Sequence, residues 1–131
     1  MPKTLAVVLT TLLASSTAFS HHSFMAEFDY RKPVTVEGVV TRIEWINPHT
    51  FFHLDVMDDR GKVVSWALQT GSPSALVMRG WNRETIKVGD HVKVYGYQAK
   101  VKPTLAAARS VMLPDGRTVF GGQTDDGGPV K

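Results

Sequence analysis

Residues 34–56, VTVEGVVTRIEWINPHTFFHLDV, decide the fold that we expect for this chain. The stretch is rich in β-branched and aromatic residues, which favour β-strands. It predicts two strands, at residues 34–46 and 51–57, joined by a short loop at Asn47-Pro48-His49. The second strand alternates, which places three apolar side chains on one face: Phe52, Leu54 and Val56.

The apolar face of the first strand changes midway along it. Val36 and Val40 share a face with Gly38, whereas Val39 and Ile43 fall on the opposite face. A change of face within one strand requires a bulge or a strong coil, and glycine permits either. We therefore expect a bulge or a strong coil at Gly38 in a long, bent first strand, as in small closed barrels.

The rest of the chain predicts three more strands, a short return strand and one helix. The strands are expected in four places: residues 62–70, 91–97, 105–113 and 117–120. Ser72 is suited to cap a short helix at residues 74–79, with Pro73 in its first position. The expected core combines apolar residues of these elements: Phe52, Leu54, Val56, Val64, Trp66, Leu68, Leu76, Val92 and Val94.

The order of these elements predicts the architecture. Three strands, a short helix and two strands is the order of an OB-fold barrel, in which the helix lies between the third and fourth strands. We therefore predict an all-β protein with a small OB-fold-like five-stranded barrel over residues 34–120. An open β-sandwich is the alternative.

Composition narrows the function classes. The chain has 131 residues, which is the size of one domain, and it contains no cysteine. Disulfides, thiolate metal sites and a cysteine nucleophile are therefore excluded. The 15 Lys and Arg residues exceed the 12 Asp and Glu residues only slightly, and no dense basic stripe occurs. The sequence therefore predicts no nucleic-acid partner.

The N-terminus predicts export. Residues 1–20 contain Lys3, an uncharged apolar run and then small residues at Ala18 and Ser20, which is the pattern of a secretory signal peptide. The apolar run is shorter than the ~20 residues of a membrane span. Cleavage after Ser20 would leave a periplasmic or secreted chain that begins at His21. Within it we expect an arm at residues 21–33 that packs on the domain and a disordered tail at residues 121–131.

The loop between the first two strands is the expected ligand end of this domain. OB folds bind ligands through strands two and three and the adjoining loops. Four residues near the loop are the candidate ligand contacts: Trp45, Asn47, His49 and Phe51. His49 could instead be a turn residue that bonds nearby backbone, and His53 is expected to be a satisfied residue on the sheet surface. The predicted function is a non-enzymatic binding module for an unknown small ligand or envelope protein.

A metal site is the alternative function. After cleavage, the amine and imidazole of His21 would together form a chelate that suits Cu(II), and His22 offers another nitrogen. His49 could be a further ligand if the arm folds back to the loop. Copper is therefore the possible cofactor. The competing interpretation is a solvated terminus without metal.

A set of short motifs also resembles a known family. The motifs recur in order along residues 21–120: HHSF, KPV, WINPH, GSP, GW, GD and PDG. Together they resemble small exported bacterial proteins of the domain of unknown function 6152. The resemblance implies export and a compact β domain, and it implies no established activity or catalytic residue. Residues 100–103 depart from it, because a more glycine-rich turn is expected there.

Overall fold

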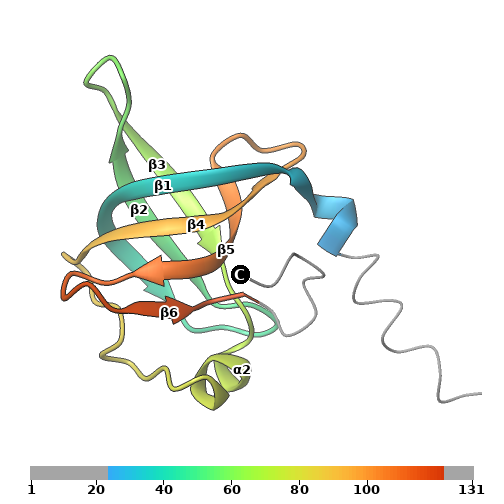
Figure 1. Ribbon diagram of the computed structural model, residues 1–131, viewed down its shortest axis with the longest axis vertical. Helices are drawn as coiled ribbons and strands as arrows, with labels where there is room; N and C mark the ends of the chain where they lie inside the picture. The colour runs from blue at the N-terminus through green and yellow to red at the C-terminus, as the bar shows by residue number, and fades with distance from the viewer. Residues whose placement is uncertain (1–23, 123–131) are drawn as a thin grey trace, which may run out of the picture.

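A computed structural model describes residues 24–122, which are mostly β-strand (Figure 1). The all-β prediction is confirmed. Six strands are present in the described part of the chain: β1 (Phe28–Glu44), β2 (Phe51–Met57), β3 (Val63–Gln69), β4 (His91–Ala99), β5 (Leu105–Met112) and β6 (Thr118–Phe120). The helix α2 (Pro73–Met78) follows β3, and one helical turn occupies residues 24–27. Along residues 24–122, no helix has the length and apolarity to cross a membrane.

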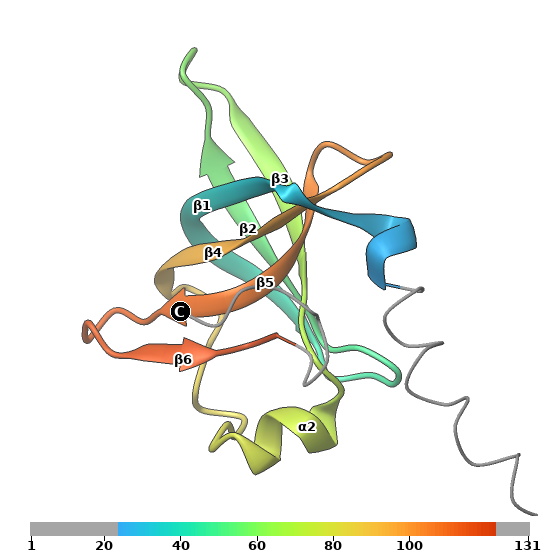
Figure 2. The same ribbon diagram turned by 45° about the vertical axis from the view of Figure 1, so that its right-hand side comes forward.

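The six strands form one sheet in the order β3-β2-β1-β4-β5-β6. A further pairing joins β3 to β5 in parallel, with Ala67 opposite Leu105 and Gln69 opposite Ala107. The pairings of β1, β2, β3, β5 and β4 therefore form a closed circuit, and β6 extends the sheet from β5. Figures 1 and 2 show how β1 bends so that one strand can serve both sides of this circuit.

Strand β1 changes partner near its middle. Residues 33–39 pair with β4, and residues 39–44 pair with β2. The predicted bulge at Gly38 is wrong, because the register shift lies between Val40 and Arg42. Val39 is exposed rather than inward-facing. Gly38 has a different role: a Cβ there would lie 2.2 Å from the carbonyl oxygen of Asp55, so the two strands meet at a distance that only glycine allows.

The main core confirms most of the predicted core residues. Six of them are buried: Phe52, Leu54, Leu68, Leu76, Val92 and Val94. Val56, Val64 and Trp66 are only partly buried, which corrects the prediction for these three. Figure 1 shows why: the β2–β3 hairpin projects beyond the other strands, so its outer part has less cover. Trp81 and Ile86 complete the core from the segment between α2 and β4.

A second apolar cluster fixes the N-terminal part of the described chain. It contains Phe24, Phe28, Tyr97, Ala99 and Ala107. The rings of Phe24 and Phe28 lie 5.0 Å apart between centroids. Within the predicted arm at residues 21–33, the described part from residue 24 packs on the domain through Phe24 and Phe28, and residues 28–33 belong to β1. The β1–β4 pairing has a register shift between Phe28, which lies opposite Ala99, and Pro33, which lies opposite Tyr97.

Local signals placed α2 correctly. The Ser72 hydroxyl accepts a hydrogen bond from the Ala75 N–H at 3.2 Å, Pro73 is the first helical residue, and Gly80 has a φ of 91°. The predicted tail at residues 121–131 is partly wrong, because Gly121 and Gly122 are buried. The Gly71 N–H donates to the Gly121 carbonyl at 2.9 Å. Residues 123–131, like the predicted signal peptide at 1–20, lie outside the described part of the chain.

Candidate functional site

The base of the β1–β2 loop is held by backbone hydrogen bonds. The Thr50 N–H donates to the Gly71 carbonyl at 3.0 Å. The Thr50 carbonyl accepts from both the N–H and the hydroxyl of Thr70, each at 2.9 Å. Both threonines are buried, so these bonds are shielded from water. The end of the β1–β2 loop next to β2 is therefore fixed to the segment that follows β3.

The tip of the same loop is exposed. Asn47 and Pro48 are exposed and are joined by a cis peptide bond, and Ile46 is half-exposed. His49 is half-buried, and its Nδ1 lies 3.1 Å from the Thr70 carbonyl oxygen. Because a carbonyl only accepts hydrogen bonds, this contact assigns the proton to Nδ1 and the lone pair to Nε2. The loop thus combines a fixed base with an accessible tip.

The four predicted ligand contacts do not share one surface. Trp45 is partly buried against the main core, and the guanidinium carbon of Arg83 lies 5.2 Å from its ring centroid. Asn47 and His49 belong to the loop itself. Phe51 lies on the outer face of β2, because its neighbour Phe52 points into the core. The structure therefore places Asn47 and His49 on one loop and Trp45 against the core.

The predicted metal ligands are only partly within the described chain. His21 and His22 lie outside it. Among residues 24–122, no three His, Asp or Glu side chains gather in a way that could hold a metal ion. Figure 1 shows the helical turn at residues 24–27 beside the start of β1 and the β1–β2 loop, which carries His49, lower in the view near α2.

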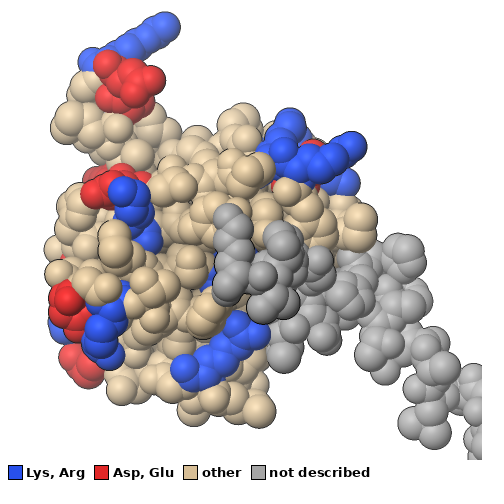
Figure 3. All heavy atoms as spheres, viewed as in Figure 1, with Lys and Arg blue, Asp and Glu red and all other residues tan. Residues whose placement is uncertain are grey.

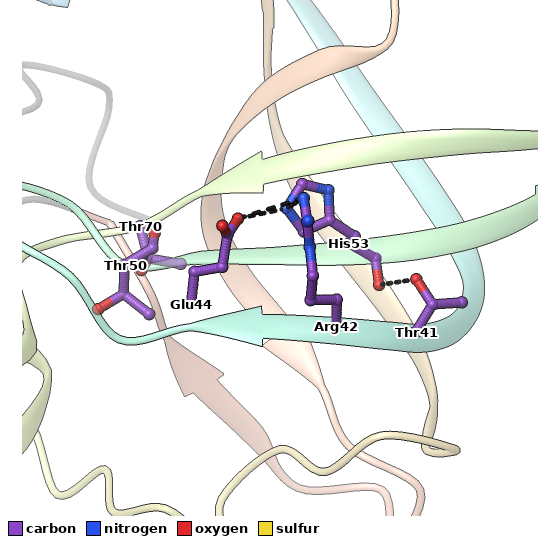
Figure 4. A network of polar contacts seen from close by, with 6 residues as sticks. All are labelled: Thr41, Arg42, Glu44, Thr50, His53 and Thr70. Carbon is purple, nitrogen blue, oxygen red and sulfur yellow. Dashed lines mark hydrogen bonds and ion pairs between the residues drawn. The ribbon is translucent and has the colours of Figure 1, made fainter.

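Sequence reasoning missed a charged cluster on the outer face of β1 and β2 (Figure 4). His53 Nε2 lies 2.7 Å from Glu44 Oε2 and 3.0 Å from Arg42 Nη2. A carboxylate only accepts, so Nε2 donates to Glu44, and Arg42 contributes its charge at 3.5 Å from the same oxygen. The hydrogen bond from His53, followed by the charge of Arg42, holds the pKa of Glu44 below its usual value of 4.5.

This cluster could have been predicted only from the pairing of residues on the outer faces of β1 and β2. Arg42 lies opposite His53, and Glu44 lies opposite Phe51. Side chains at such positions interact across the ladder. The register could not be read from the sequence, because it depends on the shift between Val40 and Arg42. The prediction that His53 is a hydrogen-bonded residue of the sheet surface agrees with these contacts.

Comparison with known protein families matches residues 9–106 to the family of unknown function DUF6152. The match covers more than half of the chain. The chain belongs to DUF6152. This confirms the resemblance drawn from the short motifs, whose WINPH and GSP segments form the loop and the helix cap described above. No curated protein matches the chain. Membership in DUF6152 assigns no role to the β1–β2 loop, so its function has to be argued from its geometry.

Proposed function

We propose that this DUF6152 protein is an exported, non-enzymatic binding module of the OB type, with its ligand end at the β1–β2 loop. The OB assignment is supported by the closed circuit of strand pairings, in which β3 and β5 run parallel and α2 lies between β3 and β4. Export is supported by the sequence pattern of residues 1–20. Periplasmic or secreted material is therefore where the protein and its ligand should be sought.

One observation carries the choice of site: the loop is preorganised. Its end next to β2 is fixed by the bonds of Thr50 with Thr70 and Gly71, while Asn47 and Pro48 at its tip remain exposed. A loop that is already ordered loses little conformational entropy when a ligand binds, which raises affinity for a given set of contacts. The amide of Asn47 and the apolar side chain of Ile46 suit a sugar, a peptide or a protein surface.

Binding without catalysis is supported by the surroundings of the histidines. The His53 ring donates to Glu44 through Nε2 and lies beside Arg42, and the Thr41 hydroxyl donates to the His53 backbone carbonyl rather than to its ring. A nucleophilic serine or threonine would need a hydroxyl within hydrogen-bond reach of a basic imidazole. Around His53, in the described part of the chain, the hydrogen bonds include no such hydroxyl.

Photocrosslinking in the native envelope tests the ligand end. A photoreactive phenylalanine derivative would replace Asn47, and in a matched control it would replace Arg60, which is exposed in the β2–β3 turn. Intact-mass spectrometry after illumination would reveal small ligands and proteins alike. We expect a defined adduct from position 47 and none of that mass from position 60. Equal labelling of both positions would show that the loop is not the ligand end.

A copper site is a second candidate, supported by the orientation of His49. Metal-ligating histidines commonly donate their other ring N–H to a carbonyl, as His49 Nδ1 does to Thr70. The proposed site would combine the amine and imidazole of a processed His21 with His22 and His49. One-to-one Cu(II) binding that weakens in His49→Ala is the expected result.

A further inference from the structure

The β4–β5 loop carries an exposed apolar side chain between two lysines. Val101 is 93% exposed, and Lys100 and Lys102 on either side of it are also exposed. Met25, in the helical turn at residues 24–27, is 52% exposed. The Lys100 N–H donates to the Glu27 carbonyl at 2.9 Å, and Lys100 Nζ contacts the Met25 carbonyl. The loop and the helical turn are therefore held side by side.

Basic residues of β1 add to this region. Arg31 and Lys32 are exposed near the start of β1, and Figure 3 shows Lys and Arg side chains gathered where β1 begins and β4 meets β5. Arg31 pairs with Asp29 at 3.2 Å, whereas Lys32 and Lys102 form no ion pair with any described residue. We call the six residues the basic tip: Met25, Arg31, Lys32, Lys100, Val101 and Lys102. Their four positive charges exceed the two negative charges of Glu27 and Asp29 beside them.

A shallow apolar hollow lies next to the basic tip. It has a volume of about 350 Å³ and lies between the helical turn and the β4–β5 loop. Its lining residues are mostly apolar: Ala26, Glu27, Ala99, Val101, Lys102 and Leu105. The basic tip therefore combines a group of positive charges, the exposed side chain of Val101 and an apolar hollow in one region.

We propose that the basic tip docks this protein on the surface of an anionic lipid bilayer. Lysine and arginine near a bilayer are attracted by acidic headgroups, and apolar side chains between them enter the boundary with the acyl chains. In this arrangement Lys32, Lys100 and Lys102 contact headgroup phosphates. Val101 and Met25 lie in the interface, and the hollow receives part of an acyl chain.

The exposed valine favours a bilayer over a soluble polyanion. Attraction to a polyanion needs only the charges and falls steeply with salt. The side chain of Val101, which is 93% exposed between Lys100 and Lys102, stabilises a complex only where it can leave water. The inference does not depend on the ligand of the β1–β2 loop, since that loop contributes no residue to the basic tip.

Vesicle co-sedimentation tests the proposal. The full chain, its N-terminus verified by mass spectrometry, would be mixed with vesicles of phosphatidylcholine alone or of phosphatidylcholine and phosphatidylglycerol in equal amounts. We expect binding to the anionic vesicles only. Lys32→Glu with Lys102→Glu should reduce the partition coefficient at least about tenfold, given the usual contribution of each basic residue. Val101→Ser should reduce it roughly fivefold to tenfold.

Matched controls separate the basic tip from overall charge and hydrophobicity. Lys62→Glu with Lys87→Glu makes the same change in net charge at exposed positions elsewhere, and Val88→Ser removes a valine that is 65% exposed. Every variant has the same N-terminus, so any contribution of residues 1–20 cancels in the comparison. Equal losses in the tip and control variants would overturn the proposal. Binding to heparin that persists when vesicle binding is absent would also overturn it, in favour of a soluble polyanion.

Discussion

The position of Gly38 is fixed by the carbonyl oxygen of Asp55. A Cβ at position 38 would lie 2.2 Å from this oxygen and 3.0 Å from Val56 Cγ2. The contact occurs where β1 passes from its pairing with β4 to its pairing with β2. The path of β1, and with it the closed circuit of strand pairings, therefore depends on the absence of a side chain at this position.

Gly38→Ala should destabilise the fold. The added methyl group must displace backbone rather than a flexible side chain, so we expect a loss of about 2–4 kcal/mol, at or above the usual range for overpacking. Urea unfolding followed by circular dichroism measures it. Gly61→Ala is the control, because the space around Gly61 is open and only its φ of 78° opposes alanine. A loss at Gly38 no larger than at Gly61 would contradict the close approach.

Trp81 should contribute more to stability than Trp66. Trp81 is buried and its Nε1–H donates to the Phe120 carbonyl at 2.8 Å, whereas Trp66 is only partly buried. Trp81→Ala should cost about 3–5 kcal/mol, the range for a large buried aromatic residue. Trp66→Ala should cost about 1–3 kcal/mol. Denaturant unfolding of both variants decides the order. The reverse order would contradict the link between the burial of each tryptophan and its contribution to stability.

The C-terminal part of the described chain should be needed for full stability. Gly121 donates to the Arg109 carbonyl and accepts from the Gly71 N–H, each at 2.9 Å. A chain that ends at Phe120 should therefore be less stable than one that ends at Gly122, by about 1–3 kcal/mol for two backbone hydrogen bonds. Thermal unfolding of the two truncated chains gives the difference. Equal melting temperatures would show that residues 121–122 contribute nothing to the stability of the fold.

Local patterns explain which elements the sequence predicted well. Strand β2 has the predicted bounds, Phe51–Met57, because its alternation is regular and the turn Asp58-Asp59-Arg60-Gly61 ends it. Helix α2 was found because Ser72 and Pro73 carry specific signals for a helix start. These features depend on residues that are near each other in the chain, and such features are the ones that propensity and periodicity describe.

Features that depend on contacts between residues far apart in the chain could not be predicted from the sequence. The contact of Trp81 with Phe120 joins segments 39 residues apart. The Glu44–His53 pair depends on a register shift that no local pattern marks. The sequence did predict that Asn47 and His49 lie on the loop between the first two strands, because the loop has a local signal. The sequence left the orientation of Trp45 open, since that orientation is decided by packing against the core.

The Glu44–His53 pair should make stability depend on acid pH. The pKa of Glu44 is lowered in the folded state, first by the hydrogen bond from His53 and then by the charge of Arg42. A lowered pKa means that ionised Glu44 stabilises the fold above its usual pKa of 4.5. This contribution begins to fall near that pH and is lost once the pH is below the folded-state pKa.

Glu44→Gln should therefore narrow the stability difference between pH 7 and acid pH. Melting temperatures measured between about pH 7 and pH 3 would show the variant losing less stability than the unmodified chain, because the titrating partner is absent. Glu84→Gln is the charge-matched control, since the Glu84 carboxylate has no ion pair in the described part of the chain. If the melting temperatures of the unmodified chain and Glu44→Gln fall in parallel with pH, the Glu44–His53 pair does not contribute to the pH dependence of stability.

The copper candidate makes a prediction about the first residue of the processed chain. If this residue is His21, its amine and imidazole have reference pKa values of ~8 and ~6.5, so both nitrogens are readily freed near neutral pH. Cu(II) should then bind more tightly than Zn(II), and binding should weaken towards pH 5 as protons compete. Acetylating the α-amine of His21 should weaken Cu(II) binding at least about tenfold, because the chelate loses its amine nitrogen.

His49→Ala separates a dedicated site from a chelating terminus. If the arm returns to the β1–β2 loop, this variant should weaken Cu(II) binding and shift the d–d absorption band, because one nitrogen ligand is lost. His91→Ala is the matched control, since His91 is exposed on β4 and has Glu37 as its partner at 3.9 Å. If His49→Ala and His91→Ala both bind like the unmodified chain, copper is held by the terminus alone. The orientation of His49 by Thr70 would then serve only to fix the loop.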